Sequence, residues 1–232
     1  MNVAFLITTY NRQESCQRLV DALQGQGDIV VVNDGCDYII NGCEQHFLDQ
    51  HNGKTYYWIT VNTLFAYRGV HKYYFMLPDD FLPTENMVQD AITLWKSIDD
   101  KNKICLNLIA DRVGMNCWTN FIPRDLGNVW LTQWVDMCFM CESKFFDIVR
   151  INEIPYTSAS RKNISSGVGA MISRQLHGRD YHLFLVKNSL MVPQPEHGIS
   201  QMHDYSHIVD YEHNKRARGR RQRIVFDTRK KR

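Results

Sequence analysis

Two adjacent aspartates, Asp79 and Asp80, follow an apolar run at residues 73–76 that is typical of a β-strand. Neighbouring carboxylates repel each other and lose hydration when buried, so a fold tolerates them at a strand end mainly where a positive charge neutralises them. Hard divalent cations are commonly held by one or two carboxylates together with substrate phosphates. The pair therefore predicts a cation site for a phosphorylated ligand, and a solvated turn is the alternative interpretation.

The beginning of the chain predicts two parallel strands that end near these acids. Residues 3–9 and 28–35 are apolar runs of the kind found in strands buried on both faces, and residues 14–23 between them have helical spacing. Such a β-α-β unit predicts a right-handed parallel pair. Ligands of open α/β sheets bind at the carboxyl edge of the strands. The polar residues expected at this edge are Thr8, Thr9, Tyr10, Arg12, Asn33 and Asp34.

The rest of the chain continues the alternation of strands and helices. Ahead of the acids we expect a short helix at 43–48, a third strand at 54–60 and a helix at 62–72. Beyond them we expect helices at 86–98, 144–150 and 167–176, and strands at 104–109, 135–141, 183–186 and 189–192.

Composition excludes several classes of protein. A chain of 232 residues suits one domain with a sizeable core. It contains no apolar run near the roughly 20 residues that span a bilayer, and its N-terminus lacks the basic region of a signal peptide. Seven cysteines form no framework, which predicts reduced thiols in a cytoplasmic protein.

The charge of the chain is unevenly distributed. Residues 1–213 carry 17 basic and 24 acidic residues, net −7, whereas residues 214–232 carry 10 basic residues and one acidic residue, net +9. A tail this basic predicts contact with a polyanion, namely nucleic acid or an anionic membrane surface. A solubilising terminus is the alternative.

Three motifs in order resemble the GT-A fold of nucleotide-sugar-dependent glycosyltransferases, in the style of family 2. Residues 7–12 resemble the first strand and loop along the nucleotide base, residues 31–35 resemble the second strand with its terminal aspartate, and residues 68–80 resemble the helix, strand and DxD-type metal motif. The resemblance implies a single α/β domain of Rossmann-like GT-A type, with a mixed, mainly parallel sheet flanked by helices. Residues 1–110 would bind the nucleotide sugar, residues 111–213 the acceptor, and residues 214–232 would form the basic C-terminal tail.

The same resemblance assigns roles to the site residues. Asp80 would ligate Mn²⁺ or Mg²⁺ directly, and Asp79 would do so through water or bind the ribose. Asp34 and Arg12 would hold the nucleoside and phosphates, beside Thr8, Thr9, Tyr10 and Asn33. Arg68 would pair with phosphate, since guanidinium groups match phosphate oxygens, or be a solvated charge on a helix. His197 would be a metal ligand or a structural histidine.

The catalytic base is the open question of the second half. An inverting transferase needs a carboxylate beside the acceptor hydroxyl, yet the acid expected at the start of the helix falls at Gly167 and Val168. Asp136 is the candidate, because an acid buried in the apolar run 135–140 would have a raised pKa, as a base near neutral pH requires. An acid that only binds backbone is the alternative, and a retaining mechanism stays open.

The resemblance thus implies a metal-dependent glycosyltransferase, of hexosyltransferase type, that uses a UDP-sugar. The basic tail suggests DNA with a hydroxymethylated base, of phage type, as the acceptor, and a polysaccharide or glycolipid is the alternative. Two other classes remain: a sugar-nucleotide nucleotidyltransferase, and a non-catalytic nucleic-acid-binding module. The sugar, the acceptor, the stereochemistry and the oligomeric state are left open.

Overall fold

The sheet is built around β1 (Val3–Thr9), whose residues are all buried. In the computed structural model, which describes residues 2–110, 122–151 and 167–194, β2 (Asp28–Asn33) and β4 (Tyr73–Pro78) pair with β1 in parallel on either side. Thr8 lies opposite both Val32 and Pro78. The three strands therefore end at one edge of the sheet, as the β-α-β pattern predicts.

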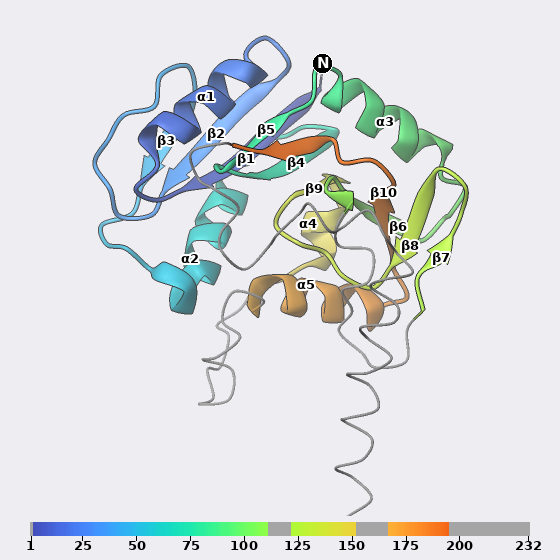
Figure 1. Cartoon of the computed structure of the whole chain (residues 1–232). Coiled ribbons are helices and arrows are strands. Elements are labelled where there is room, and N and C mark those ends of the chain that lie inside the picture. Colours follow the sequence, from blue (N-terminus) through green and yellow to red (C-terminus); the bar gives the residue numbers. More distant parts are fainter. Residues whose placement is uncertain (1, 111–121, 152–166, 195–232) are drawn as a thin grey trace, which may run out of the picture.

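Helices cover both faces of the sheet, as Figure 1 shows. On one face α1 (Gln13–Leu23) and α3 (Met87–Ser97) pack on the side chains of Phe5 and Phe75. On the other face α2 (Gly53–Ala66), α4 (Lys144–Ile148) and α5 (Gly167–His177) pack on Leu6 and Met76. Successive strand residues point to opposite faces, so an uninterrupted apolar strand contributes to two cores at once.

The second half of the chain extends the same sheet. The strand β9 (Phe139–Glu142) runs antiparallel between β4 and β6 (Lys103–Asn107), and its Met140 faces Phe75 and Leu106. The sheet continues through β10 (His182–Val186) and β8 (Val129–Thr132) to β7 (Arg124–Asp125), and β3 (Glu44–Phe47) forms its other edge. A separate ribbon pairs β5 (Phe81–Pro83) with β11 (Met191–Pro193). The mixed, mostly parallel sheet expected from the sequence is confirmed.

Two sequence-based expectations are wrong. Residues 54–60, expected as a strand, belong to α2, and that helix ends at Ala66 rather than near residue 72. Residues 44–47, expected as helix, form the edge strand β3. Strand propensity depends on tertiary context, and here the aromatic side chains of α2 pack against the sheet, with the Tyr57 hydroxyl 2.9 Å from the Thr8 hydroxyl oxygen.

No helix among the described residues combines the length and the apolar character needed to cross a bilayer. The six cysteines of this part of the chain are free thiols.

Candidate active site

The paired acids lie directly after β4, beside the carboxyl end of β1. Asp79 is 5% exposed, and its Oδ2 accepts a hydrogen bond of 2.8 Å from the Thr9 hydroxyl. The Nη1 nitrogen of Arg12 lies 2.9 Å from Asp79 Oδ1 and 3.1 Å from Asp80 Oδ2. Asp80 is the more accessible acid, with 28% of its side chain exposed against 7% for Asp79.

Burial and mutual charge shift the pKa values of Asp79 and Arg12. Burial raises the pKa of the Asp79 carboxyl, although the charge of Arg12 and the Thr9 hydrogen bond oppose the shift. Burial alone would lower the pKa of Arg12, and the two carboxylates more than offset it, so that pKa is raised. The acid pair is therefore stabilised by a positive charge at close range, as neighbouring carboxylates require.

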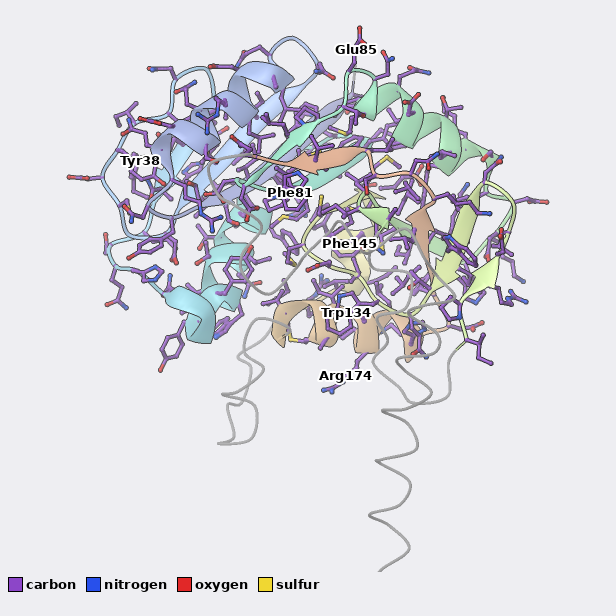
Figure 2. All side chains as sticks on the ribbon, viewed as in Figure 1. Tyr38, Phe81, Glu85, Trp134, Phe145 and Arg174 are labelled. Carbon is purple, nitrogen blue, oxygen red and sulfur yellow. The ribbon has the colours of Figure 1, made fainter. Side chains whose placement is uncertain are left out.

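An open pocket of about 790 Å³ is lined by the loops that follow β1, β2 and β3. The Tyr38 hydroxyl, from one wall of the pocket, lies 2.7 Å from Thr9 Oγ1 and accepts a 3.3 Å hydrogen bond from the Arg12 amide. Since the Thr9 hydroxyl donates to Asp79, the Tyr38 hydroxyl donates to Thr9. Figure 2 shows Tyr38 in the loop that follows β2. The residues that line the pocket are Asn11, Gly35, Cys36, Asp37, Tyr38, Phe47, Leu48 and Asp49.

Asp34 holds in place the segment at residues 49–52, whose Asp49 lines the pocket. The Oδ1 of Asp34 accepts hydrogen bonds from the Asn52 amide at 3.1 Å, the Asn52 side chain at 2.9 Å and the Thr60 hydroxyl at 2.9 Å. Its Oδ2 lies 2.9 Å from His51 Nδ1, and only 7% of the side chain is exposed. The structure thus places Asp34 at the predicted edge but uses it to hold the turn at residues 49–52 against the sheet.

The other predicted residues at this edge have distinct surroundings. Asn33 shapes the loop after β2, because its Oδ1 accepts a 3.0 Å hydrogen bond from the Cys36 amide. Tyr10 is 43% exposed, and its ring stacks on His51 with centroids 3.4 Å apart. Thr8 is buried against Tyr57 of α2. The structure therefore gathers all these polar residues around one edge, with Tyr10 the most accessible.

The partly buried Tyr57 of α2 contacts Thr8 at this edge. Burial raises the pKa of its hydroxyl, and the charges of Asp79, Asp136 and Asp34 raise it further, although the hydrogen bond with Thr8 opposes them. In the antiparallel pair of β9 (Phe139–Glu142) and β4, Phe139 lies opposite Met76, so Asp136 precedes β9 at the edge of the sheet where β4 ends. This register brings the candidate base to the edge that carries the acid pair.

Two solved structures of low sequence identity share this architecture. S. aureus TarS (residues 1–349) superposes with a TM-score of 0.57 over 84% of this chain and 60% of its own, at 10% identity. GalNAc-T7, solved with UDP, GalNAc and Mn²⁺, gives a TM-score of 0.61 over 83% of this chain and 43% of its own, at 12% identity. The chain has a GT-A fold. It spans less than two thirds of the length of either neighbour. No family model and no curated protein matches the sequence.

Within the GT-A domain, Asp136 lies in the loop before β9 rather than inside a strand. Its side chain is half-buried, which corrects the expectation of full burial. The Asp136 amide donates to Asn107 Oδ1 at 3.0 Å, and the buried Asn107 amide group donates to the Trp134 carbonyl at 2.9 Å. The Oδ1 of Asp136 accepts a 2.9 Å hydrogen bond from the Met137 amide. The end of β6 thus fixes the loop that carries the candidate base.

The helix α5, where a GT-A transferase of this style would carry its acid, has no acidic residue in its first turn. Val168 is buried there, and Gly169 lies so close to the Val135 carbonyl that an added Cβ would approach its oxygen to 2.7 Å. Arg174 points from the outer side of α5 away from the sheet in Figure 2. Within its described residues, α5 therefore supplies packing rather than a base.

Arg68 is not part of the site, which corrects its predicted phosphate role. It follows α2 and precedes β4, so it lies at the opposite edge of the sheet from Asp79. Its guanidinium donates to the Phe65 carbonyl at 2.5 Å and lies 4.7 Å from the centroid of the Phe146 ring. His197, the predicted metal ligand, lies outside the described residues, as do residues 214–232.

Two residues of the GT-A site are not predicted from the sequence. Tyr38 lies shortly after the Asn33-Asp34-Gly35 motif, and this proximity is the sequence feature that indicates it. Gln194 carries no sequence signal. Its amide nitrogen Nε2 donates to the carbonyls of Ser15 at 2.9 Å and Asp79 at 3.0 Å, and its backbone amide donates to the Asp80 carbonyl at 2.8 Å. These bonds fix the backbone of the acid pair against α1.

Proposed function

We propose that the protein transfers a hexose from a UDP-type nucleotide sugar to an acceptor hydroxyl with the help of a divalent cation. One observation carries the proposal: the Tyr38 wall of an open pocket is joined by two successive hydrogen bonds, through Thr9, to the acid pair after β4. A nucleoside in the pocket would have its diphosphate near Asp80. The structural neighbour GalNAc-T7, solved with UDP and Mn²⁺, supports the choice of donor and cation.

The residues present fit such a cation. The described part of the chain contains no cluster of three or more metal-binding side chains, which suits an ion held by one or two carboxylates and completed by phosphates and water. Asp80 would be the direct ligand because it is more exposed, whereas both oxygens of Asp79 already accept hydrogen bonds. A bound cation would neutralise the charge that develops on the leaving diphosphate. Asp136 would accept the acceptor proton if the transfer inverts the anomeric centre.

The acceptor is the less constrained half of the proposal. The hypothesis of a hydroxymethylated DNA base is based on the charge of residues 214–232, which lie outside the described structure. A polysaccharide or glycolipid is the alternative acceptor. The donor half can be tested without an acceptor, because water replaces the acceptor in slow hydrolysis.

The test is hydrolysis of a panel of UDP-sugars by the full chain, with Mn²⁺ and with a chelator. We expect slow hydrolysis of at least one sugar that needs Mn²⁺ and that falls by about 100-fold or more in Asp80→Asn, as for the loss of one electrostatic group of an active site. The matched control is Asp90→Asn, because Asp90 is an exposed acid on α3. It should keep the wild-type rate.

The same assay separates the rival classes. Formation of a UDP-sugar from UTP and a sugar 1-phosphate, in place of hydrolysis, would identify a nucleotidyltransferase. Neither turnover nor Mn²⁺-dependent UDP binding would identify a non-catalytic module and overturn the proposal.

A further inference from the structure

A single nitrogen of Arg12 lies between the two carboxylates of the acid pair. Nη1 is 2.9 Å from Asp79 Oδ1 and 3.1 Å from Asp80 Oδ2. A divalent cation held directly by Asp80 and through water by Asp79 would occupy the same place. We propose that Arg12 occupies the cation position in the free protein, and that it yields this position when the cation and a nucleoside diphosphate bind together. The inference rests on the proposed function and adds to it a residue that controls cation binding.

The surroundings of Arg12 allow this exchange. The side chain is 38% exposed, and among the described residues its guanidinium bonds only to these two acids. Its sequence neighbour Asn11 lines the pocket, so a diphosphate that extends from the pocket toward Asp80 passes within reach of the guanidinium. Arginine pairs strongly with phosphate oxygens. The diphosphate therefore gives the Arg12 guanidinium a new anionic partner when the cation binds the carboxylates.

The exchange makes cation binding depend on the nucleotide. A cation that binds alone must displace Arg12 from its carboxylates and leave the guanidinium without an anionic partner. A cation that binds with a diphosphate avoids this loss. Direct ligation of the cation by phosphate also couples the two ligands, so cooperativity by itself does not reveal the role of Arg12. The affinity of the protein for the cation in the absence of nucleotide does reveal the role of Arg12.

The experiment measures Mn²⁺ binding to the full chain without nucleotide, from the electron paramagnetic resonance signal of free Mn²⁺. We expect Arg12→Gln to bind Mn²⁺ more tightly than wild type by about 5- to 150-fold, the range typical of coupled sites. The control is Lys96→Gln, which loses the same charge at an exposed position in the last turn of α3. We expect its Mn²⁺ affinity to stay within about twofold of wild type, as for a screened charge.

Equal or weaker Mn²⁺ binding by Arg12→Gln would overturn the inference, and so would an equal gain in Lys96→Gln. If circular dichroism shows that Arg12→Gln is unfolded, wild type supplies the answer. The side-chain Nε–H resonance of Arg12 should shift when Mg²⁺ and UDP are added together, and an unchanged resonance would overturn the inference. Wild type that binds no Mn²⁺ even with UDP would overturn the proposed function too. Mn²⁺-dependent hydrolysis without the Arg12 effect would overturn this inference alone.

Discussion

The hydroxyl of Thr9 connects the open pocket at Tyr38 to the acid pair. It donates to Asp79 Oδ2 at 2.8 Å and accepts from the Tyr38 hydroxyl at 2.7 Å. Thr9 and Asp79 are both buried, so water does not readily replace either bond. A buried polar group left without a partner costs more than the net value of the bond it made. The position is therefore more sensitive to substitution than a threonine at a strand end would ordinarily be.

Replacing this hydroxyl should separate its chemistry from its shape. We expect Thr9→Val, which keeps the volume and removes the oxygen, to lower the free energy of unfolding by about 1–3 kcal/mol. Thr9→Ser keeps the oxygen and should retain most of that stability. Urea unfolding followed by tryptophan fluorescence measures both. Equal losses in the two variants would mean that the methyl group, and not the hydrogen bonds, carries the effect.

At the scale of single residues, the sequence predicted positions better than roles. Asp34 lies at the sheet edge where it was expected, but its two oxygens are engaged by Asn52, Thr60 and His51. No sequence pattern predicts these partners, because His51 and Asn52 precede α2, and Thr60 lies inside that helix, where the sequence predicts a strand. The guanidinium of Arg68 suits phosphate, but it lies at the edge of the sheet opposite Asp79. Its position follows from where α2 ends, and the sequence pattern does not give that end.

Among the elements, β1, β2 and β4 were predictable because strands buried on both faces have continuous apolar runs. The helix α2 was not. Its run Tyr56-Tyr57-Trp58-Ile59-Thr60 is rich in residues that favour strands. The neighbouring sheet overrides that preference, since α2 packs on β1 and β2 and Asp34 binds residues at its start. These contacts join residues distant in sequence, which a local pattern does not contain.

The turn after β2 depends on Gly35, and a matched glycine isolates the reason. Gly35 and Gly127 both have φ of +87°, but an added Cβ would lie 2.2 Å from the His51 nitrogen at Gly35 and meets nothing within 4 Å at Gly127. Both alanine variants should lose about 1–2 kcal/mol through left-handed strain. Gly35→Ala should lose more and also weaken UDP binding, because the clash moves the pocket wall. Urea unfolding and UDP calorimetry test this, and equal losses at the two sites would contradict it.

In the whole molecule, one sheet joins the two predicted halves. The strand β9, from the half expected to bind the acceptor, lies between β4 and β6 of the half expected to bind the nucleotide. The division at residue 110 is therefore a proposal about ligands and not about folding units. The sequence shows that residues 139–142 suit a strand, but an antiparallel insertion between two earlier strands follows from long-range pairing alone. This insertion also places the loop of Asp136 at the edge where β4 and β6 end.

Residues 214–232 carry a net charge of +9 and lie outside the described residues. If they bind a DNA acceptor, their lysines and arginines would pair with its phosphates. Affinity from such charge pairing should fall steeply with salt, because each neutralised phosphate releases counterions.

Deleting residues 214–232 should weaken binding to double-stranded DNA and flatten its dependence on salt. The deletion removes 10 basic residues, and each phosphate that the shortened chain no longer neutralises should reduce the slope of log K against log salt by about 0.9. Fluorescence anisotropy of a labelled duplex at several salt concentrations measures both. A full-length variant with Lys215, Arg216, Arg218, Arg220 and Arg221 replaced by glutamine controls for length and should show an intermediate slope. Equal binding by the truncated chain would remove the DNA hypothesis and leave the donor half of the proposed reaction untouched, since Asp80, Arg12 and the pocket all lie before residue 195.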